Sequence, residues 1–79
     1  MEWVQVIERT ADFVRLRYYP NQNGARGEYG EVTYFFATDK WTFDKIALGT
    51  RYTMHACNFV RQRYRNGEEI PQEGLAAWI

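Results

Sequence analysis

The segment from residue 13 to residue 19 constrains the fold most, because its residues alternate strictly in character. Successive side chains of a β-strand point to opposite faces of a sheet, so alternation of this kind predicts a strand with one buried face. The set expected on the buried face is apolar and consists of Val14, Leu16 and Tyr18. The opposite set mixes aromatic rings with guanidinium groups and consists of Phe13, Arg15, Arg17 and Tyr19.

Further strands are predicted on both sides of this one. Residues 3–8 and 31–37 are rich in β-branched and aromatic side chains, and the short polar connection after residue 8 favours a hairpin with residues 13–19. Residues 39–48 allow two interpretations. Asp39 could cap a short helix, or Trp41-Thr-Phe could form a fourth strand after a turn, which we favour because these residue types prefer strands.

One helix is predicted, over residues 51–65, with Thr50 as its N-cap and Asn66-Gly67 as its stop. At 100° per residue one arc of this helix is apolar and consists of Tyr52, Ala56, Cys57, Phe59, Val60 and Tyr64. The polar face carries Met54, Asn58, Arg61 and Arg65. The apolar residues 75–79 are expected to pack into the core or to pair as an edge strand.

These elements predict a single small α+β domain over residues 1–79. We expect a three- to five-stranded, mostly antiparallel sheet with one amphipathic helix packed on one face. A single helix covers only one face of a sheet, so the other face must be solvated, covered by the 20–30 loop, or covered by another molecule. That loop holds three glycines and a proline and is the longest irregular stretch.

Composition excludes several classes of function. Ten basic and ten acidic residues give a net charge of zero, which removes the simplest argument for a polyanionic partner. One cysteine and one histidine allow neither an intrachain disulfide nor a structural zinc site. Apolar runs are too short to span a membrane, and the first residues do not resemble a signal peptide, so we expect a soluble, cytoplasmic protein.

No catalytic or cofactor-binding pattern is present either. His55 and Cys57 diverge by roughly 200° around the helix, so they cannot form a dyad, and the chain contains no serine. The glycines of the 20–30 loop do not form a phosphate-binding motif. We therefore expect no enzyme, no cofactor and no metal. An enzyme would require a pocket around His55 with a carboxylate in hydrogen-bond reach.

The uncovered face of the sheet is the predicted binding surface. We expect a small interaction module that self-associates or binds a protein there, with a single-stranded nucleic acid as the alternative because rings can stack on bases and guanidinium groups can bind phosphates. Sheet pairing is expected to bring Glu8 near an arginine of residues 13–19, and Arg61 and Arg65 are expected to pair with Glu68 or Glu69. The candidate partner-binding residues are Phe13, Arg15, Arg17, Tyr19, Phe35, Arg61 and Arg65.

The C-terminal part carries a short pattern of turn and core residues: His55-Ala56, Arg63, Asn66-Gly67, Ile70-Pro71, Glu73-Gly74 and Ala77-Trp78. In this pattern the chain resembles the end of small bacterial proteins of uncharacterised function. The resemblance covers about the last 25 residues. It implies a small domain of bacterial or phage type and carries no activity with it.

Overall fold

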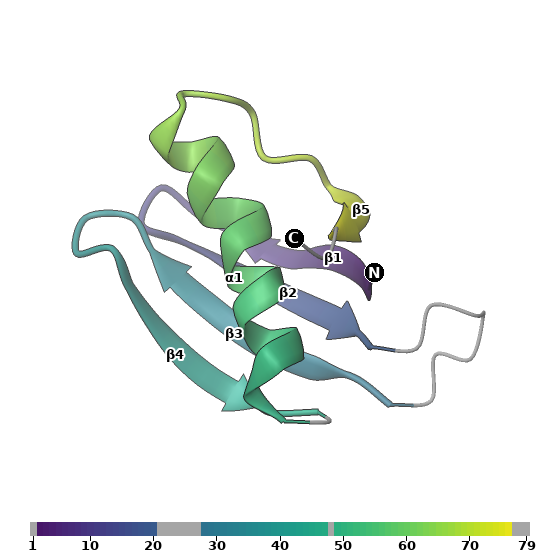
Figure 1. The fold of residues 1–79 in the computed structure, drawn as a ribbon. Helices are drawn as coiled ribbons and strands as arrows, with labels where there is room; N and C mark the ends of the chain where they lie inside the picture. The colour runs from purple at the N-terminus through teal and green to yellow at the C-terminus, as the bar shows by residue number, and fades with distance from the viewer. Residues whose placement is uncertain (1, 21–27, 48, 77–79) are drawn as a thin grey trace.

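The computed structural model describes residues 2–20, 28–47 and 49–76, which form one sheet and one helix (Figure 1). The strands are β1 (Glu2–Arg9), β2 (Phe13–Tyr19), β3 (Gly30–Phe35), β4 (Lys40–Lys45) and β5 (Glu73–Ala76). Helix α1 (Thr50–Arg65) lies between β4 and β5 in the chain. The strand order is β4-β3-β2-β1-β5, and neighbouring strands are antiparallel. The predicted α+β fold is confirmed.

The predicted strands agree with the observed ones except at their ends. Residues 13–19 form β2 as expected, and the ambiguous stretch after residue 39 forms strand β4. Strand β3 ends at Phe35 rather than at residue 37, because residues 36–39 form the turn into β4. The C-terminal segment pairs with β1 as edge strand β5, whereas residues 77–79 lie outside the described part of the chain.

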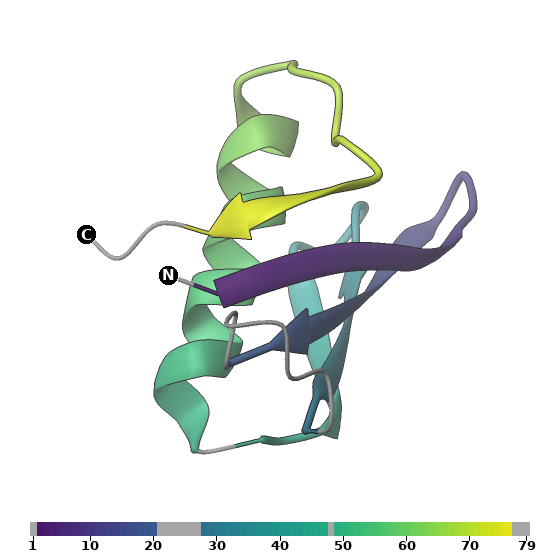
Figure 2. The ribbon, with the colours of Figure 1, turned by 90° about the vertical axis from the view of Figure 1, so that its right-hand side faces the viewer.

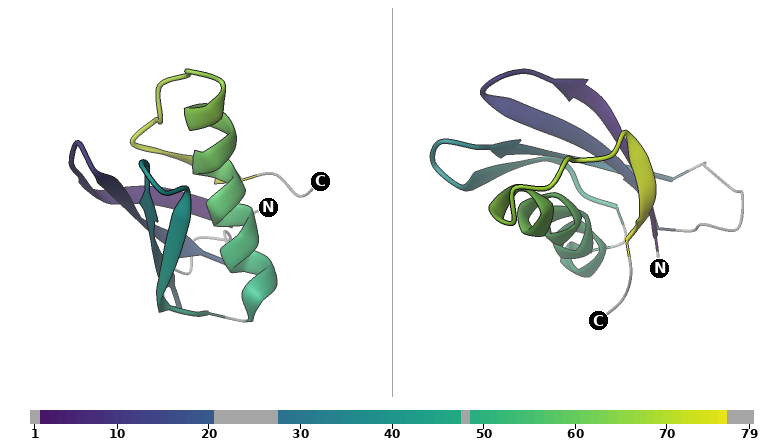
Figure 3. Two further views of the ribbon diagram at one scale, coloured as in Figure 1. Left: turned by 90° about the vertical axis from the view of Figure 1, so that its left-hand side faces the viewer. Right: turned by 90° about the horizontal axis from the view of Figure 1, so that it is seen from above.

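Helix α1 covers one face of the sheet, as the side views and the view from above make clear (Figures 2 and 3). It is 16 residues long, and no helix of the described residues is long and apolar enough to cross a membrane. The helix stops at Asn66, and Gly67 has a φ of 71°, so the predicted C-terminal stop is confirmed.

The predicted cap of α1 is wrong. Gly49, with a φ of 87°, is the N-cap, and no side chain caps the helix. Thr50 is instead the first helical residue. A glycine reaches this left-handed backbone conformation without the steric cost that a Cβ would bring, which explains why the chain enters the helix there.

The buried face of α1 differs from the predicted arc at three positions. Tyr52 is only partly buried against the core. Tyr64 is 44% exposed and stacks on Phe36, with ring centroids 4.7 Å apart. Thr53, which was not predicted, is buried because its hydroxyl pairs with that of Tyr18. The buried residues of the helix are Thr53, Ala56, Cys57, Phe59 and Val60.

The core lies between α1 and the apolar face of the central strands. Val14, Leu16 and Tyr18 have no exposed surface, so the predicted inward set of β2 is confirmed. The Tyr18 hydroxyl also accepts a hydrogen bond from the Ala47 amide, at 3.2 Å. The Tyr18 ring crosses directly over Gly30 on β3, where an added Cβ would lie 2.2 Å from a ring carbon, so this position admits only glycine without a shift of the ring.

Candidate functional site

The face of the sheet opposite α1, called the outer face below, carries the residues predicted to lie away from the helix. Cross-strand pairing sets Phe13 opposite Phe35, and Arg15 opposite Thr33. Tyr19 lies opposite Trp3 on β1 and, at 7% exposed, is the one buried member of the set. The view from above shows that α1 lies on the other side of the sheet (Figure 3, right). The structure thus brings five of the seven candidate residues onto one surface.

The centre of the outer face is a layer of ion pairs. Arg15 Nη1 lies 3.1 Å from Glu8 Oε1, and Arg15 Nε donates to Thr33 Oγ1 at 3.1 Å. The Thr33 hydroxyl in turn donates to Asp44 Oδ2 at 2.7 Å, and Arg15 lies 3.9 Å from the same oxygen. These long side chains leave Thr33 only 1% exposed although no helix or strand of the described residues packs on this face. The expected contact between Glu8 and a β2 arginine is confirmed.

Arg17 has its own carboxylate partner one row further along the sheet. Its Nε and Nη2 atoms donate to Glu31 Oε2 at 3.0 and 2.7 Å. The hydrogen bond to Glu31 raises the pKa of the Arg17 guanidinium above its ordinary value. Glu31 was not identified from the sequence, although it is the direct cross-strand neighbour of Arg17. The signal that could have found it is the hairpin register between residues 13–19 and 31–37.

Aromatic side chains lie at both ends of this polar layer. At one end the rings of Phe13 and Phe35 are 5.8 Å apart between centroids. At the other end Tyr29 lies 6.2 Å from Tyr19 and meets two cations: Arg17 Cζ is 4.3 Å and Lys45 Nζ 3.7 Å from its ring centroid. The outer face is therefore an ion-paired centre between two aromatic ends.

Arg61 and Arg65 do not join this surface. Both lie on α1, on the other side of the sheet, and both contact Asp39 in the β3–β4 turn, at 3.4 and 2.6 Å. The predicted pairing with Glu68 or Glu69 is wrong, because the C-terminal half of α1 packs beside this turn. The candidate binding residues thus separate into an outer-face set and a pair that ties the helix to the sheet.

The Asp39 carboxylate is the centre of this tie. It accepts a hydrogen bond from the Tyr34 hydroxyl, and this bond with the two arginines holds the pKa of Asp39 below its ordinary value. Burial and the same hydrogen bond raise the pKa of Tyr34 to about 12. Asp39 has a φ of 55°, a left-handed conformation that aspartate tolerates better than most residues.

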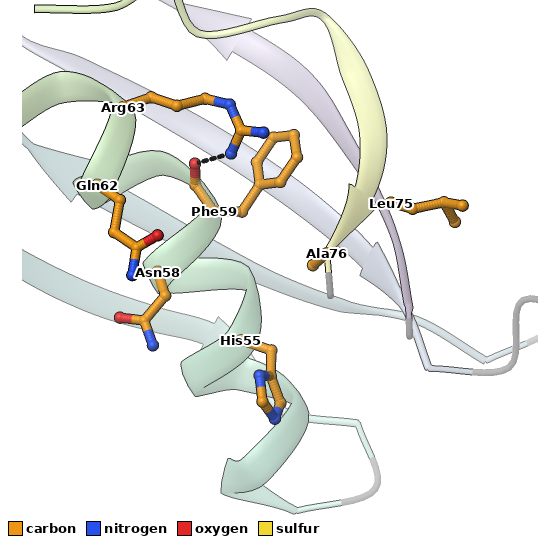
Figure 4. A pocket seen from close by; sticks show the side chains of 7 residues that line it. All are labelled: His55, Asn58, Phe59, Gln62, Arg63, Leu75 and Ala76. Carbon is orange, nitrogen blue, oxygen red and sulfur yellow. Dashed lines mark hydrogen bonds between the residues drawn. The ribbon is translucent and has the colours of Figure 1, made fainter. Parts of the chain in front are cut away.

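A pocket of about 360 Å³ lies between α1 and β5 (Figure 4). None of the described residues that line it carries a carboxylate. The Nη1 atom of Arg63 donates to the Phe59 carbonyl at 2.7 Å, and its Cζ lies 4.1 Å from the Phe59 ring centroid. The lining residues are His55, Asn58, Phe59, Gln62, Arg63, Leu75 and Ala76.

Two buried titratable groups lie elsewhere, on the covered side of the sheet. Cys57 is fully buried, as expected, and burial raises the pKa of its thiol to about 12, so it stays protonated at neutral pH. Glu2 is also fully buried, and neither of its carboxylate oxygens has a hydrogen-bond partner among the described residues. Its burial raises its pKa to about 8. Within the described ranges no group of three or more potential metal ligands occurs.

Comparisons of this chain with protein-family models, with curated proteins and with solved structures found no match. The resemblance of its C-terminal part to small bacterial proteins stays a prediction.

Proposed function

We propose that this protein is a small interaction module that self-associates through the outer face of its sheet. The observation that carries the proposal is the combination on that face of an internally paired polar layer with aromatic rings at its two ends. Arg15 and Arg17 already have carboxylate partners, so an approaching surface does not need to neutralise them. The aromatic ends offer the large rigid contact area that is enriched in protein interfaces.

Charge balance favours a second copy of the chain as the partner. The charged side chains that the contacts of the polar layer join include three acidic and three basic ones: Glu8, Arg15, Arg17, Glu31, Asp44 and Lys45. A twofold dimer sets the same patch against itself, so each charge must find its opposite within that patch. A face of mixed sign meets this condition, whereas a face of one sign would repel its copy.

The same pairing makes a single-stranded nucleic acid the weaker candidate. Its phosphates would have to displace Glu8 or Glu31 from the two guanidinium groups. Affinity for a polyanion comes mainly from cations that neutralise phosphates and release counterions, and a face with balanced charges supplies little of this.

Sedimentation velocity on the full chain between about 1 and 100 µM, a range in which specific complexes usually form, tests the proposal. We expect a dimer that Phe35→Lys weakens roughly tenfold or more, because the change puts an ammonium group into an aromatic end of the interface. Met54→Lys is the matched control: Met54 is 45% exposed on α1, away from the outer face, and its substitution should leave the dimer unchanged.

A monomer throughout this concentration range overturns self-association. A dimer that tolerates Phe35→Lys but not Met54→Lys places the interface on the helix side and overturns the outer face as the site. Thermal unfolding followed by circular dichroism verifies that both variants fold, so that a loss of dimer is read as a loss of contact.

A further inference from the structure

The pocket between α1 and β5 is the second surface with the features of a binding site, and it is independent of the outer face. Its helix side comes from positions 55, 58, 59, 62 and 63, whose spacing of three and four residues puts them on one face of α1. Its volume of about 360 Å³ is within the range of small-ligand sites. Figure 4 shows these side chains along the helix, with β5 on the opposite side.

The Phe59 ring lies at the base of the pocket, tightly against β5, and the residue is only 5% exposed. An added Cβ on Gly74 would come within 3.2 Å of two carbons of that ring, so the ring occupies the space a side chain would otherwise take. Leu75 and Ala76 form the β5 rim. Because Ala76 is only 4% exposed and Leu75 is 46% exposed, the apolar surface offered to the body of a ligand comes mainly from Leu75 and the edge of Phe59.

The pocket also carries positive charge, and none of the described residues that line it is acidic. Arg15, Arg17, Arg61 and Arg65 each have a carboxylate within 4 Å, whereas Arg63 has none among the described residues. The one hydrogen bond of Arg63 to Phe59 uses Nη1 and fixes the guanidinium over the ring. The side-chain amides of Asn58 and Gln62 also line the pocket, and Figure 4 shows them directed away from the Arg63 guanidinium.

We propose that this pocket binds a small organic carboxylate whose body is apolar or aromatic. The guanidinium of Arg63 binds the carboxylate, and the apolar lining from Leu75 and the exposed edge of Phe59 contacts the body. Inorganic phosphate fits less well, because the single guanidinium among the described lining residues balances only part of its charge, and phosphate has no apolar body to contact Leu75. A neutral ligand of the same shape leaves Arg63 without its counter-charge.

Amide chemical-shift titration of the full chain with 3-phenylpropanoate tests the proposal, with 3-phenylpropanamide and inorganic phosphate as the other probes. We expect shifts confined to the pocket residues of α1 and β5, with a Kd of about 1 mM, as the size of the probe allows. Phosphate and the amide should bind at least about tenfold more weakly, because phosphate lacks the apolar body and the amide lacks the negative charge.

Three variants, each of which lowers the net charge by one, separate the effect of the pocket on binding from the effect of the overall charge. Gln62→Glu puts a carboxylate on the exposed rim and should weaken binding of 3-phenylpropanoate about tenfold or more without touching the core. Arg63→Gln should weaken it similarly. Arg65→Gln, on the same helix but directed to Asp39, should leave the Kd within about twofold.

Several outcomes overturn the proposal: no saturable shifts at millimolar probe, equal binding of the neutral amide, tighter binding of phosphate, or equal losses in all three variants. Gln62→Glu keeps the test decisive if Arg63→Gln fails to fold, because residue 62 is solvent-exposed.

Discussion

At the scale of single residues, Glu2 is the least expected feature of the molecule. Its carboxyl group lies on the covered side of β1, opposite Ala76 of β5, with no exposed surface. Burial favours the neutral form of a carboxyl group because the charged form loses its hydration, and this raises the pKa of Glu2 from 4.5 to about 8. The folded state therefore binds this proton more tightly than the unfolded state does.

This difference predicts a pH dependence of stability. The contribution of the neutral carboxyl is complete below the unfolded pKa of 4.5 and is lost as the pH rises through the folded pKa of about 8. We expect the free energy of unfolding to fall by up to about 1.4 kcal/mol per pH unit between those values. Glu2→Gln should remove this slope and make the protein more stable than the wild type at pH 8.

Urea unfolding at pH 5, 6.5 and 8 measures this effect. Glu73→Gln, an exposed position on β5, is the control and should keep the slope of the wild type. A wild-type slope that survives in Glu2→Gln would show that another group binds the proton.

At the scale of elements, the tie between α1 and the β3–β4 turn depends on Asp39. Asp39 accepts a hydrogen bond from the hydroxyl of Tyr34, a residue that is only 1% exposed. The two arginines that contact Asp39 lie in the last turns of α1. Loss of the negative charge leaves these two guanidinium groups without their carboxylate. The orientation of the helix C-terminal half on the sheet is thus set by a turn residue that no helical or strand pattern marks.

Asp39→Asn should therefore lower the Tm at pH 7 by a few degrees while keeping a residue type that tolerates the left-handed backbone. Because the pKa of Asp39 is depressed, its contribution is present above the ordinary aspartate pKa and is lost as the pH falls through the folded value. The difference in Tm between the variant and the wild type should shrink below pH 4. Calorimetry at pH 7 and pH 3 measures both effects.

Asp12→Asn, an exposed aspartate in the β1–β2 turn, is the matched control and should leave the Tm unchanged. An equal drop in both variants would mean that overall charge, rather than the contacts of Asp39, determines the effect.

At the scale of the whole molecule, the two faces of the sheet differ in what packs on them. Helix α1 packs on one face, whereas on the other face the charged side chains form ion pairs with one another. A chain with balanced charges on its open face should bind a single-stranded oligonucleotide weakly and with little dependence on salt. Fluorescence anisotropy with a labelled 12-mer at 50 and 200 mM salt measures this. Submicromolar affinity that falls steeply with salt would instead support the nucleic-acid alternative.

The alternation of residues 13–19 was sufficient to assign both faces of β2 correctly. Pleating is a local property of an extended backbone, so side-chain direction follows from position parity wherever the strand is regular. The spacing of apolar residues identified α1 for the same reason, and its errors lie at the ends and edges. Tyr64 and Thr53 were misplaced because a ring stack with Phe36 and a hydroxyl pair with Tyr18 depend on neighbours that periodicity does not contain.

The sequence by itself determined the fold class, the face of each β2 residue and the existence of one helix, because these follow from short-range periodicity. Only the tertiary structure decided which carboxylate each arginine meets. Arg17 pairs with Glu31 because the strand register sets them opposite each other. Arg61 and Arg65 pair with Asp39 because α1 packs beside a turn that is distant in the chain. The pocket beside Arg63 arises likewise where β5 returns to α1. Ion pairs and pockets require groups far apart in the chain to meet within a few ångströms, and that proximity is set by the packed arrangement of the elements.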